Sequence, residues 1–360
     1  MPRPLPLAAA LTAALVAVTA SPASAAPSHW KLTYDVAASR TLGNVSNGLT
    51  SLAVLGPRDA WLAGSWDNVA TNFSAIQHFD GHRWRNTPLP GVLTSKRNSL
   101  SAVGEVSASS SGNIWAFATT QTNADGVMQH ALRWNGRAWT VQHTWKRESD
   151  RFTGVTFGPK DVWAFGDRGF GSRHFDGSSW RQVATPGVVQ QVSGVSSRNI
   201  WAAAGASLLH YDGRAWRAVK PGPGALDIRA VSARTAGDVW AVGGVRSGAN
   251  VTPVAFHWDG RAWHRYAGPR GKVAKAPLVA AVADGRGGAW LSRRSTGGGT
   301  DLFHLVRGKW VAQALPKHRL GRPYVRTLAA VPHSTALWAV GVIEYGGAPA
   351  GDTVVYSGTR

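Results

Sequence analysis

The chain has 360 residues, of which 39 are Lys or Arg and 19 are Asp or Glu, so its formal charge is +20 at pH 7. It contains 42 Gly and 18 Trp but no Cys. The absence of cysteine excludes a disulfide framework, a thiolate metal site and a cysteine nucleophile. The high glycine content and the low share of charged residues are typical of a turn-rich chain and argue against long helices.

The N-terminal segment has the pattern of a secretory signal peptide. Arg3 precedes an apolar run from Leu5 to Ala20, and the small-residue motif Ala23-Ser24-Ala25 follows it. This pattern predicts cleavage near Ala25 and a secreted, extracellular product. The run is shorter than the roughly 20 residues of a membrane-spanning helix, and no comparable run follows, so we expect no membrane span. We therefore divide the chain into a signal peptide, residues 1–25, and one domain, residues 26–360.

Tryptophans repeat along the rest of the chain. One set recurs about every 46 residues, in contexts such as Asp-x-Trp-Ala-x-Gly: Trp61, Trp115, Trp163, Trp201, Trp240, Trp290 and Trp338. A second Trp follows each of the first six: Trp84, Trp139, Trp180, Trp216, Trp263 and Trp310. A repeat of this length is typical of a β-propeller.

The second set marks hairpin turns. Five of its members end the motif aromatic-(Asp/Asn)-Gly-x-x-Trp, as in the segment from Phe79 to Trp84. An Asp-Gly or Asn-Gly pair between alternating apolar segments predicts a tight hairpin in which both residues have positive φ.

Each repeat divides into four short strands. In the repeat that begins at Ile228, the strands are expected at residues 228–231, 238–243, 254–258 and 262–266, with Gly or Pro at the bends. Four-stranded units at this period predict an all-β, seven-bladed β-propeller of four-stranded antiparallel blades.

The two ends of the chain complete one blade. The last repeat contains Trp338 and a third strand at residues 352–356, but its closing Trp would fall one position past Arg360. Residues 29–36, which contain Trp30, look like a fourth strand without a preceding hairpin. We therefore expect the N-terminal strand to join the C-terminal blade and close the ring, because this pairs the two end strands instead of leaving two unpaired edges.

The repeat motifs resemble those of a known group of proteins. Asp-Val-Trp-Ala-Val-Gly at 238–243 and His-Trp-Asp-Gly-x-x-Trp at 257–263 resemble secreted bacterial repeat proteins that are common in actinobacteria and have seven-bladed propeller folds. The likeness to kelch, galactose-oxidase central-domain and sialidase-type propellers is more distant. The resemblance implies a propeller over the whole mature chain and little about activity, because propellers host unrelated functions.

The acidic residues do not form an evident catalytic pair. Several Asp residues lie in hairpin turns or before a repeated Trp, and the three glutamates are Glu105, Glu148 and Glu344. A glycosidase needs two carboxylates about 5 to 10 Å apart. A hydrolase or lyase would require one of these glutamates to face another carboxylate or a His in the central mouth. We assign no catalytic residue, leave catalysis open and favour a non-catalytic protein without a cofactor.

Histidine recurs at one position of the repeat. Aligning the closing tryptophans puts the following residues at this position, with Arg133 and Val355 in the other two blades: His78, His174, His210, His257 and His304. Third strands of different blades diverge radially, so these side chains are too far apart to share a metal ion at about 2 Å. We predict a packing and hydrogen-bonding role, and no metal site.

The loops that vary in length gather basic residues. Links from second to third strands and from blade to blade share one face of a propeller, where binding sites usually form. The candidate ligand-binding residues there are Trp66, Trp145, Lys96, Arg97, Arg147, Arg246, Lys272, Lys275, Arg293, Arg294, Arg319 and Arg322. A basic face with spare indoles suits an anionic polymer or a sugar ring.

These observations favour a secreted, monomeric binding module for an anionic polymer, glycan or protein of the cell envelope. Basic residues also occur in the opposite turns, for example Arg137 and Arg261, so an undirected basic surface with an unidentified protein partner stays open. A polysaccharide hydrolase or lyase and a protein–protein interaction scaffold stay open as well. A specific nucleic-acid ligand is not expected, because no recognition motif accompanies the charge.

Overall fold

The computed structural model describes residues 30–35, 46–67, 72–146, 152–167, 169–269, 276–344 and 352–359. The predicted signal peptide lies outside these ranges, so its cleavage stays a prediction. In the described part of the chain, no helix is both long and apolar enough to cross a membrane.

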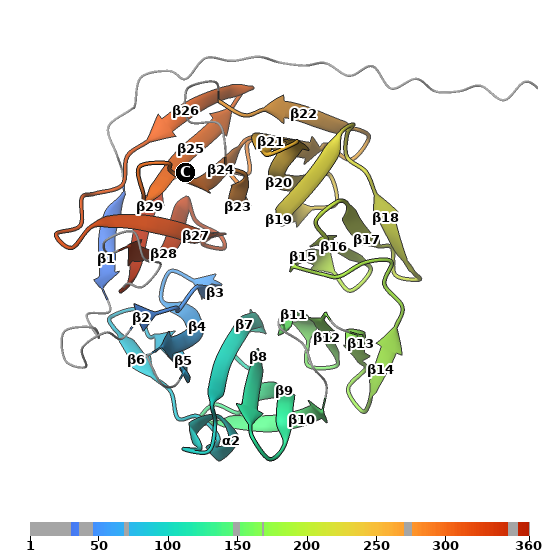
Figure 1. Ribbon diagram of the computed structural model, residues 1–360, viewed down its shortest axis with the longest axis vertical. Helices are drawn as coiled ribbons and strands as arrows, with labels where there is room; N and C mark the ends of the chain where they lie inside the picture. Colours follow the sequence, from blue (N-terminus) through green and yellow to red (C-terminus); the bar gives the residue numbers. More distant parts are fainter. Residues whose placement is uncertain are drawn as a thin grey trace, which may run out of the picture.

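The described strands form seven antiparallel sheets around a central axis, with the first strand of each sequence repeat innermost (Figure 1). This arrangement confirms the predicted seven-bladed propeller. Blade 1 contains β3 (Ser51–Gly56), β4 (Asp59–Asp67), β5 (Asn72–Phe79) and β6 (Trp84–Asn86). Blade 2 contains β7 (Leu100–Ser110), β8 (Asn113–Thr122), β9 (Gly126–Trp134) and β10 (Trp139–Lys146). Blade 3 contains β11 (Phe152–Gly158), β12 (Asp161–Gly166), β13 (Gly171–Phe175) and β14 (Trp180–Val183). In blade 1, the short strand β2 (Ser46–Asn47) also pairs with β4, and α2 (Gly91–Thr94) lies in the link to blade 2.

The remaining blades follow in chain order. Blades 4 to 7 contain β15 (Gln191–Ser196), β16 (Asn199–Ala203), β17 (Leu208–Tyr211) and β18 (Trp216–Val219); β19 (Ala225–Thr235), β20 (Asp238–Ser247), β21 (Asn250–Trp258) and β22 (Trp263–Ala267); β23 (Leu278–Ala283), β24 (Ala289–Arg294), β25 (Thr300–Val306) and β26 (Lys309–Gln313); and β27 (Arg322–Ala330), β28 (Ala336–Glu344), β29 (Thr353–Thr359) and β1 (Lys31–Asp35).

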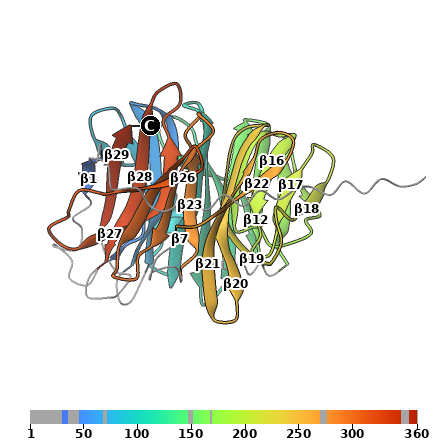
Figure 2. The ribbon, with the colours of Figure 1, turned by 90° about the horizontal axis from the view of Figure 1, so that it is seen from above.

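The second strand of each blade is the most deeply buried. In β20 the first seven residues are buried, because β19 and β21 pair with its two edges and neighbouring blades cover the two faces of the sheet. Strands β19, β20 and β21 are longer than the sequence pattern predicts. The hairpin that joins β20 and β21 projects beyond the ring on one side (Figure 2).

The two sets of tryptophans pack between blades rather than within them. The second-strand Trp of one blade contacts the closing Trp of the next blade. In six such pairs the ring centroids lie 5.5–6.1 Å apart: Trp61 with Trp139, Trp115 with Trp180, Trp163 with Trp216, Trp201 with Trp263, Trp290 with Trp30, and Trp338 with Trp84. The seventh pair, Trp240 and Trp310, belongs to one buried cluster. Each repeat therefore supplies half of two interfaces, which explains why both tryptophans recur.

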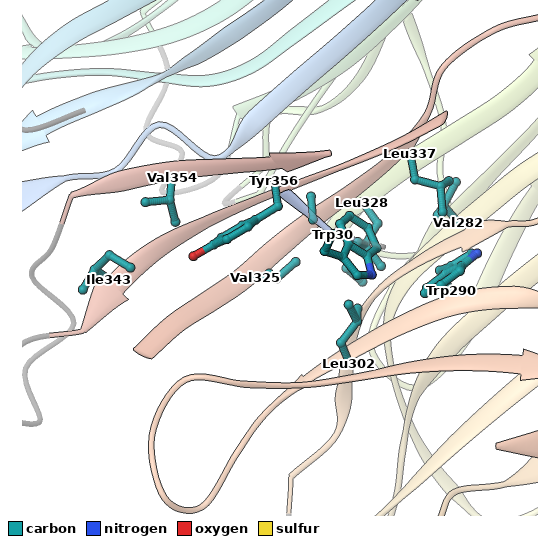
Figure 3. Packing of buried hydrophobic residues seen from close by; sticks show 12 residues of the cluster. Trp30, Val282, Trp290, Leu302, Val325, Leu328, Leu337, Ile343, Val354 and Tyr356 are labelled. Carbon is teal, nitrogen blue, oxygen red and sulfur yellow. The ribbon is translucent and has the colours of Figure 1, made fainter. Parts of the chain in front are cut away.

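The N-terminal strand closes the ring, as predicted. Strand β1 pairs antiparallel with β29, with Lys31 opposite Ser357. Trp30 is 4% exposed and packs against Trp290 of blade 6 in an edge-to-face contact (Figure 3). A Cβ atom at Gly358 would lie only 2.8 Å from the Trp30 ring, so glycine at this position makes room for the indole.

Polar contacts connect the N-terminal closing strand, β1, to blade 1 and to blade 7. Tyr34 Oη donates to Gln77 Oε1 of blade 1 at 3.0 Å, and Thr33 Oγ1 donates to the Val355 carbonyl of blade 7 at 3.0 Å. His318 Nε2 lies 3.1 Å from Asp35 Oδ2. The closing strand thus connects blade 7 to blade 1 as well as completing blade 7.

The hairpin turns differ from the predicted type. In the motif that begins at Phe79, this residue pairs with Trp84, so four residues form the loop. Gly81 has φ of 91°, but Asp80 does not have positive φ. Its side chain instead accepts the backbone N–H groups two and three residues ahead, each at 2.9 Å. The two-residue turn with two positive φ angles occurs in blade 6, where Arg307 and Gly308 have φ of 49° and 75°.

Candidate functional site

The recurring histidines are structural. Each stacks on the second-strand Trp of its own blade, with ring centroids 4.0–4.4 Å apart. The Nε2 atom lies 2.9–3.1 Å from an Asp or Asn side-chain oxygen in each pair: His78 with Asp59, His174 with Asp161, His210 with Asn199, His257 with Asp238, and His304 with Asp284. Burial acts to raise the pKa of Asp238, but hydrogen bonds from His257 and Arg234 outweigh it and lower this pKa. The predicted packing and hydrogen-bonding role is confirmed.

The other two blades depart from this pattern. In blade 2, Arg133 lies over the Trp115 ring, 6.0 Å from its centroid. In blade 7 the prediction of Val355 at this position is wrong, because Trp338 pairs with Ser357. Placing the missing closing Trp one position past Arg360 assumes that Gly358 is the turn glycine of the motif, whereas β29 continues through Gly358 to Thr359. Among the described residues, no group of three or more His, Asp and Glu side chains could hold a metal ion.

The inner strands enclose a central channel with a volume of about 820 Å³. Its walls carry hydroxyl and carboxamide side chains, and its ionisable lining residues within the described ranges are Glu105 and Arg326. Glu105 of blade 2 accepts a hydrogen bond from Ser51 Oγ of blade 1 and another from Thr153 Oγ1 of blade 3, the latter at 3.2 Å. Burial raises the pKa of Glu105 from 4.5 to about 7, and these hydrogen bonds limit the rise.

Glu105 holds three blades together but has no catalytic partner of the expected kind. The described residues that line the channel include no second carboxylate and no histidine. The side chains of Glu148 and Glu344 lie outside the described part. The described lining of the channel therefore presents a single carboxylate, whereas glycoside hydrolysis uses two.

The predicted basic residues are distributed over several blades. Lys96 and Arg97 are exposed in the link after α2, and Arg319 is exposed in the turn before β27. Arg246, at the end of β20, pairs with Asp227 at 2.6 Å, and Arg229 pairs with the same carboxylate at 2.8 Å. Outside the described residues lie Arg147, Lys272 and Lys275, and the side chain of Trp66 is not described either.

Three arginines come together where blades 6 and 7 meet. Arg294 ends β24, and Arg322 and Arg326 lie on β27; all three are exposed. The Cζ atoms of Arg294 and Arg326 lie 5.8 and 5.3 Å from the centroid of the same Tyr324 ring. Arg322 Nη1 donates to the Gly297 carbonyl at 3.2 Å. We refer to Arg294, Arg322 and Arg326 as the arginine cluster.

Arg293, the neighbour of Arg294, does not share this surface. It is 5% exposed, its Nε donates to Asp301 Oδ2 at 2.9 Å, and its Cζ lies 5.5 Å from the Phe303 ring centroid. Because successive residues of a strand point to opposite faces, Arg294 is exposed where Arg293 is buried.

Arg326 is not among the predicted binding residues, because these were expected only in loops. Arg322, Tyr324 and Arg326 alternate along β27, so the strand presents all three on one face. This alternation is visible in the sequence once an inner strand is expected there. A β-bulge between Val325 and Thr327 makes Arg326 the extra residue of the strand, and its Cζ atom lies over the Tyr324 ring.

Trp145 belongs to a separate group of residues. It lies near the end of β10 and contacts Trp180 of blade 3, with ring centroids 5.1 Å apart. Together with Arg173 and Gln182, these residues line a groove of about 690 Å³ between blades 2 and 3. The structure thus separates the predicted residues into at least two local groups, on blades 6–7 and on blades 2–3.

No family model matches the sequence, and no curated protein matches it. Among solved structures, a chain of the mitotic checkpoint complex matches with a TM-score of 0.59 and 10% sequence identity, over 94% of this chain and 96% of that chain. The fold that the two chains share is that of a β-propeller.

Two bacterial structures also match. The extracellular domain of the hybrid two-component system BT3049 from B. thetaiotaomicron gives a TM-score of 0.49 and 11% identity, over 86% of this chain and 40% of that chain. PorZ, a surface component of the type-IX secretion system of Porphyromonas gingivalis, gives 0.46 and 12%, over 82% and 55%. This chain therefore spans less than two thirds of the length of either bacterial chain.

Proposed function

We propose that the protein is a non-catalytic binding module of the extracellular space that recognises an anionic polysaccharide through the arginine cluster. The observation that carries this proposal is the pair of exposed guanidinium groups, from Arg294 and Arg326, on one Tyr324 ring. Stacking restricts the motion of both groups before any ligand arrives, which lowers the entropic cost of binding.

The chemistry of guanidinium selects the ligand class. A guanidinium group donates two parallel hydrogen bonds to a carboxylate, phosphate or sulfate. Arg322 lies two residues before Tyr324 on β27, and Arg294 ends β24 of the neighbouring blade. The cluster therefore offers three guanidinium groups, two from β27 and one from β24. A polymer with repeated anionic groups can engage several of them at once, whereas a single small anion engages one or two.

The unusual composition agrees with this proposal. The repeat architecture requires tryptophan and glycine at set positions, but it does not require a formal charge of +20. A net positive charge attracts polyanions over several ångströms and increases the rate at which they encounter the protein.

Binding to immobilised polygalacturonate and heparin, with dextran as the neutral polymer, tests the proposal over a range of NaCl concentrations. The triple variant Arg294→Ala/Arg322→Ala/Arg326→Ala should bind about 10- to 100-fold more weakly, because each exposed ionic contact contributes up to about 1 kcal/mol. The matched control is Arg137→Ala/Arg214→Ala/Arg261→Ala, which removes the same charge from exposed turns. These turns join third to fourth strands and lie on the opposite face of the ring from the link that follows β24. Equal loss in both triple variants would show an undirected basic surface instead.

A further inference from the structure

Blade 2 departs from the repeat at its outer strand. Strand β10 has eight residues, whereas the outer strands of the other blades have three to five. The additional length carries His143 and Trp145 to the neighbouring blade, where Trp145 meets Trp180. The propeller fold does not need this extension, since six other blades form without it.

A β-bulge redirects the side chains of the extension. The register between β10 and β9 shifts between Val141 and His143, which leaves Gln142 as the extra residue. Bulges of this kind change the direction of side chains and are frequent beside functional sites. Gln142 is exposed and lines the groove between blades 2 and 3. We refer to this groove as the aromatic groove.

Aromatic packing fixes the indole rings of the groove. Trp145 makes edge-to-face contacts with Trp180, Phe170 and Phe152, with ring centroids 5.1, 5.3 and 5.9 Å apart. Trp145 and Trp180 nevertheless remain partly exposed and line the groove. An indole held in this way presents an apolar face without losing further conformational entropy when a ligand binds.

Polar groups surround the indoles. Gln142 and Gln182 bring exposed carboxamides from the two outer strands, and Arg173 brings a guanidinium group to the groove. Ser178 Oγ donates to Asp176 Oδ1 at 2.8 Å, so this hydroxyl oxygen keeps its capacity to accept hydrogen bonds. The aromatic groove therefore combines apolar ring faces with donors and acceptors of hydrogen bonds.

We propose that the aromatic groove is a second binding site, which takes a pyranose ring of an oligosaccharide. One face of a pyranose carries C–H groups that pack on indole, and its edge carries hydroxyl groups that pair with carboxamides. The volume of about 690 Å³ lies in the range of small-molecule sites. The site is independent of the arginine cluster, from which blade 1 separates it on one side of the ring and blades 4 and 5 on the other (Figure 1).

Saturation-transfer difference NMR with cellohexaose, xylohexaose, chitohexaose and hexagalacturonate tests this site. The measurements are made in 0.5 M NaCl, which screens surface charge and suppresses binding at the arginine cluster. At least one hexasaccharide should bind to the wild-type chain, and Gln142→Ala/Gln182→Ala should bind it at least about tenfold more weakly. Both glutamines are exposed, so this double variant should fold normally.

Two further variants make the result specific. Gln121→Ala removes an exposed glutamine from β8 of the same blade and should leave binding unchanged. Trp145→Phe keeps an aromatic ring in the packed group but reduces the stacking area, so it should weaken binding without loss of cooperative unfolding. Absence of binding by all four sugars at millimolar concentration, or equal binding by the double variant, would overturn the proposal. The triple arginine variant should bind the sugar as the wild type does.

Discussion

Replacement of Glu105 by Gln should change how the stability of the protein depends on pH. The carboxyl group contacts blades 1 and 3 in the central channel, where burial raises its pKa from 4.5 to about 7. In the unfolded chain the group ionises near pH 4.5, whereas in the folded chain it keeps its proton to about pH 7. The contribution of Glu105 to stability should therefore fall as the pH rises from about 4.5 to about 7 and stay constant above this range.

The magnitude follows from the size of the pKa change. One pKa unit corresponds to about 1.4 kcal/mol, so a rise from 4.5 to about 7 corresponds to a loss of at most about 3 to 4 kcal/mol. Glu105→Gln does not titrate and keeps polar atoms beside Ser51 and Thr153. The difference in the free energy of unfolding between the variant and the wild type should therefore grow in favour of the variant between pH 5 and pH 8.

Urea denaturation followed by tryptophan fluorescence at pH 5, 6, 7 and 8 measures this difference. Asp125→Asn, which removes an exposed carboxylate from the turn between β8 and β9, serves as the control and should leave the pH profile unchanged. Parallel pH profiles for the wild type and Glu105→Gln would refute the reasoning, because they would show that Glu105 ionises in the same range in both states.

Two predictions concern the ends of the chain. Trp30→Ala should lower the free energy of unfolding by about 3–5 kcal/mol, since it removes a buried indole that packs blade 7 against Trp290. Urea denaturation measures this loss, and the control Trp258→Ala, which removes a partly exposed ring, should lower the free energy of unfolding by less. A loss below about 1 kcal/mol for Trp30→Ala would contradict the role of Trp30 in ring closure. The proposed export requires that the protein expressed from its full sequence is found in the culture medium with its N-terminus near Ala26. Intact-mass measurement tests this, and a product that retains residues 1–25 would contradict it.

The blade pattern could be predicted because it depends on local chemistry. Trp spacing and Gly-containing turns occur in sequence order, and each blade pairs strands that are neighbours in the chain. The ring closure was also predictable, since Trp30 lacked a hairpin partner and the last repeat lacked its closing Trp. The details of turns were not, because the Asp80 side chain replaces the second positive φ with hydrogen bonds to the backbone.

Contacts between blades were harder to predict. The alternation of the two tryptophan sets indicates that each repeat needs two tryptophans. It does not indicate that Trp61 packs on Trp139 of the next blade. The order of residues does not give contacts between blades, so the basic loop residues were predicted as one set rather than as separate local groups. Strand direction buries Arg293 beside Asp301 and exposes Arg294, and only the meeting of blades 6 and 7 brings Arg294 to Tyr324.

The aromatic groove shows a similar limit. Trp145 was identifiable because it falls outside both tryptophan sets, whereas the repeat alone accounts for a Trp at position 180. The structure gives Trp180 two roles, since it packs against Trp115 and also lines the groove beside Trp145. A residue that a repeat requires can therefore contribute to a binding site where a neighbouring strand is longer than usual.

Hydrogen–deuterium exchange with and without polygalacturonate locates the bound polymer on the ring. We expect slower exchange in the segments that carry the arginine cluster, which are β24 with its following hairpin and β27. Exchange should be unchanged in the turns that carry Arg137, Arg214 and Arg261. Equal protection on both sides of the ring, or protection confined to those turns, would contradict recognition through the arginine cluster.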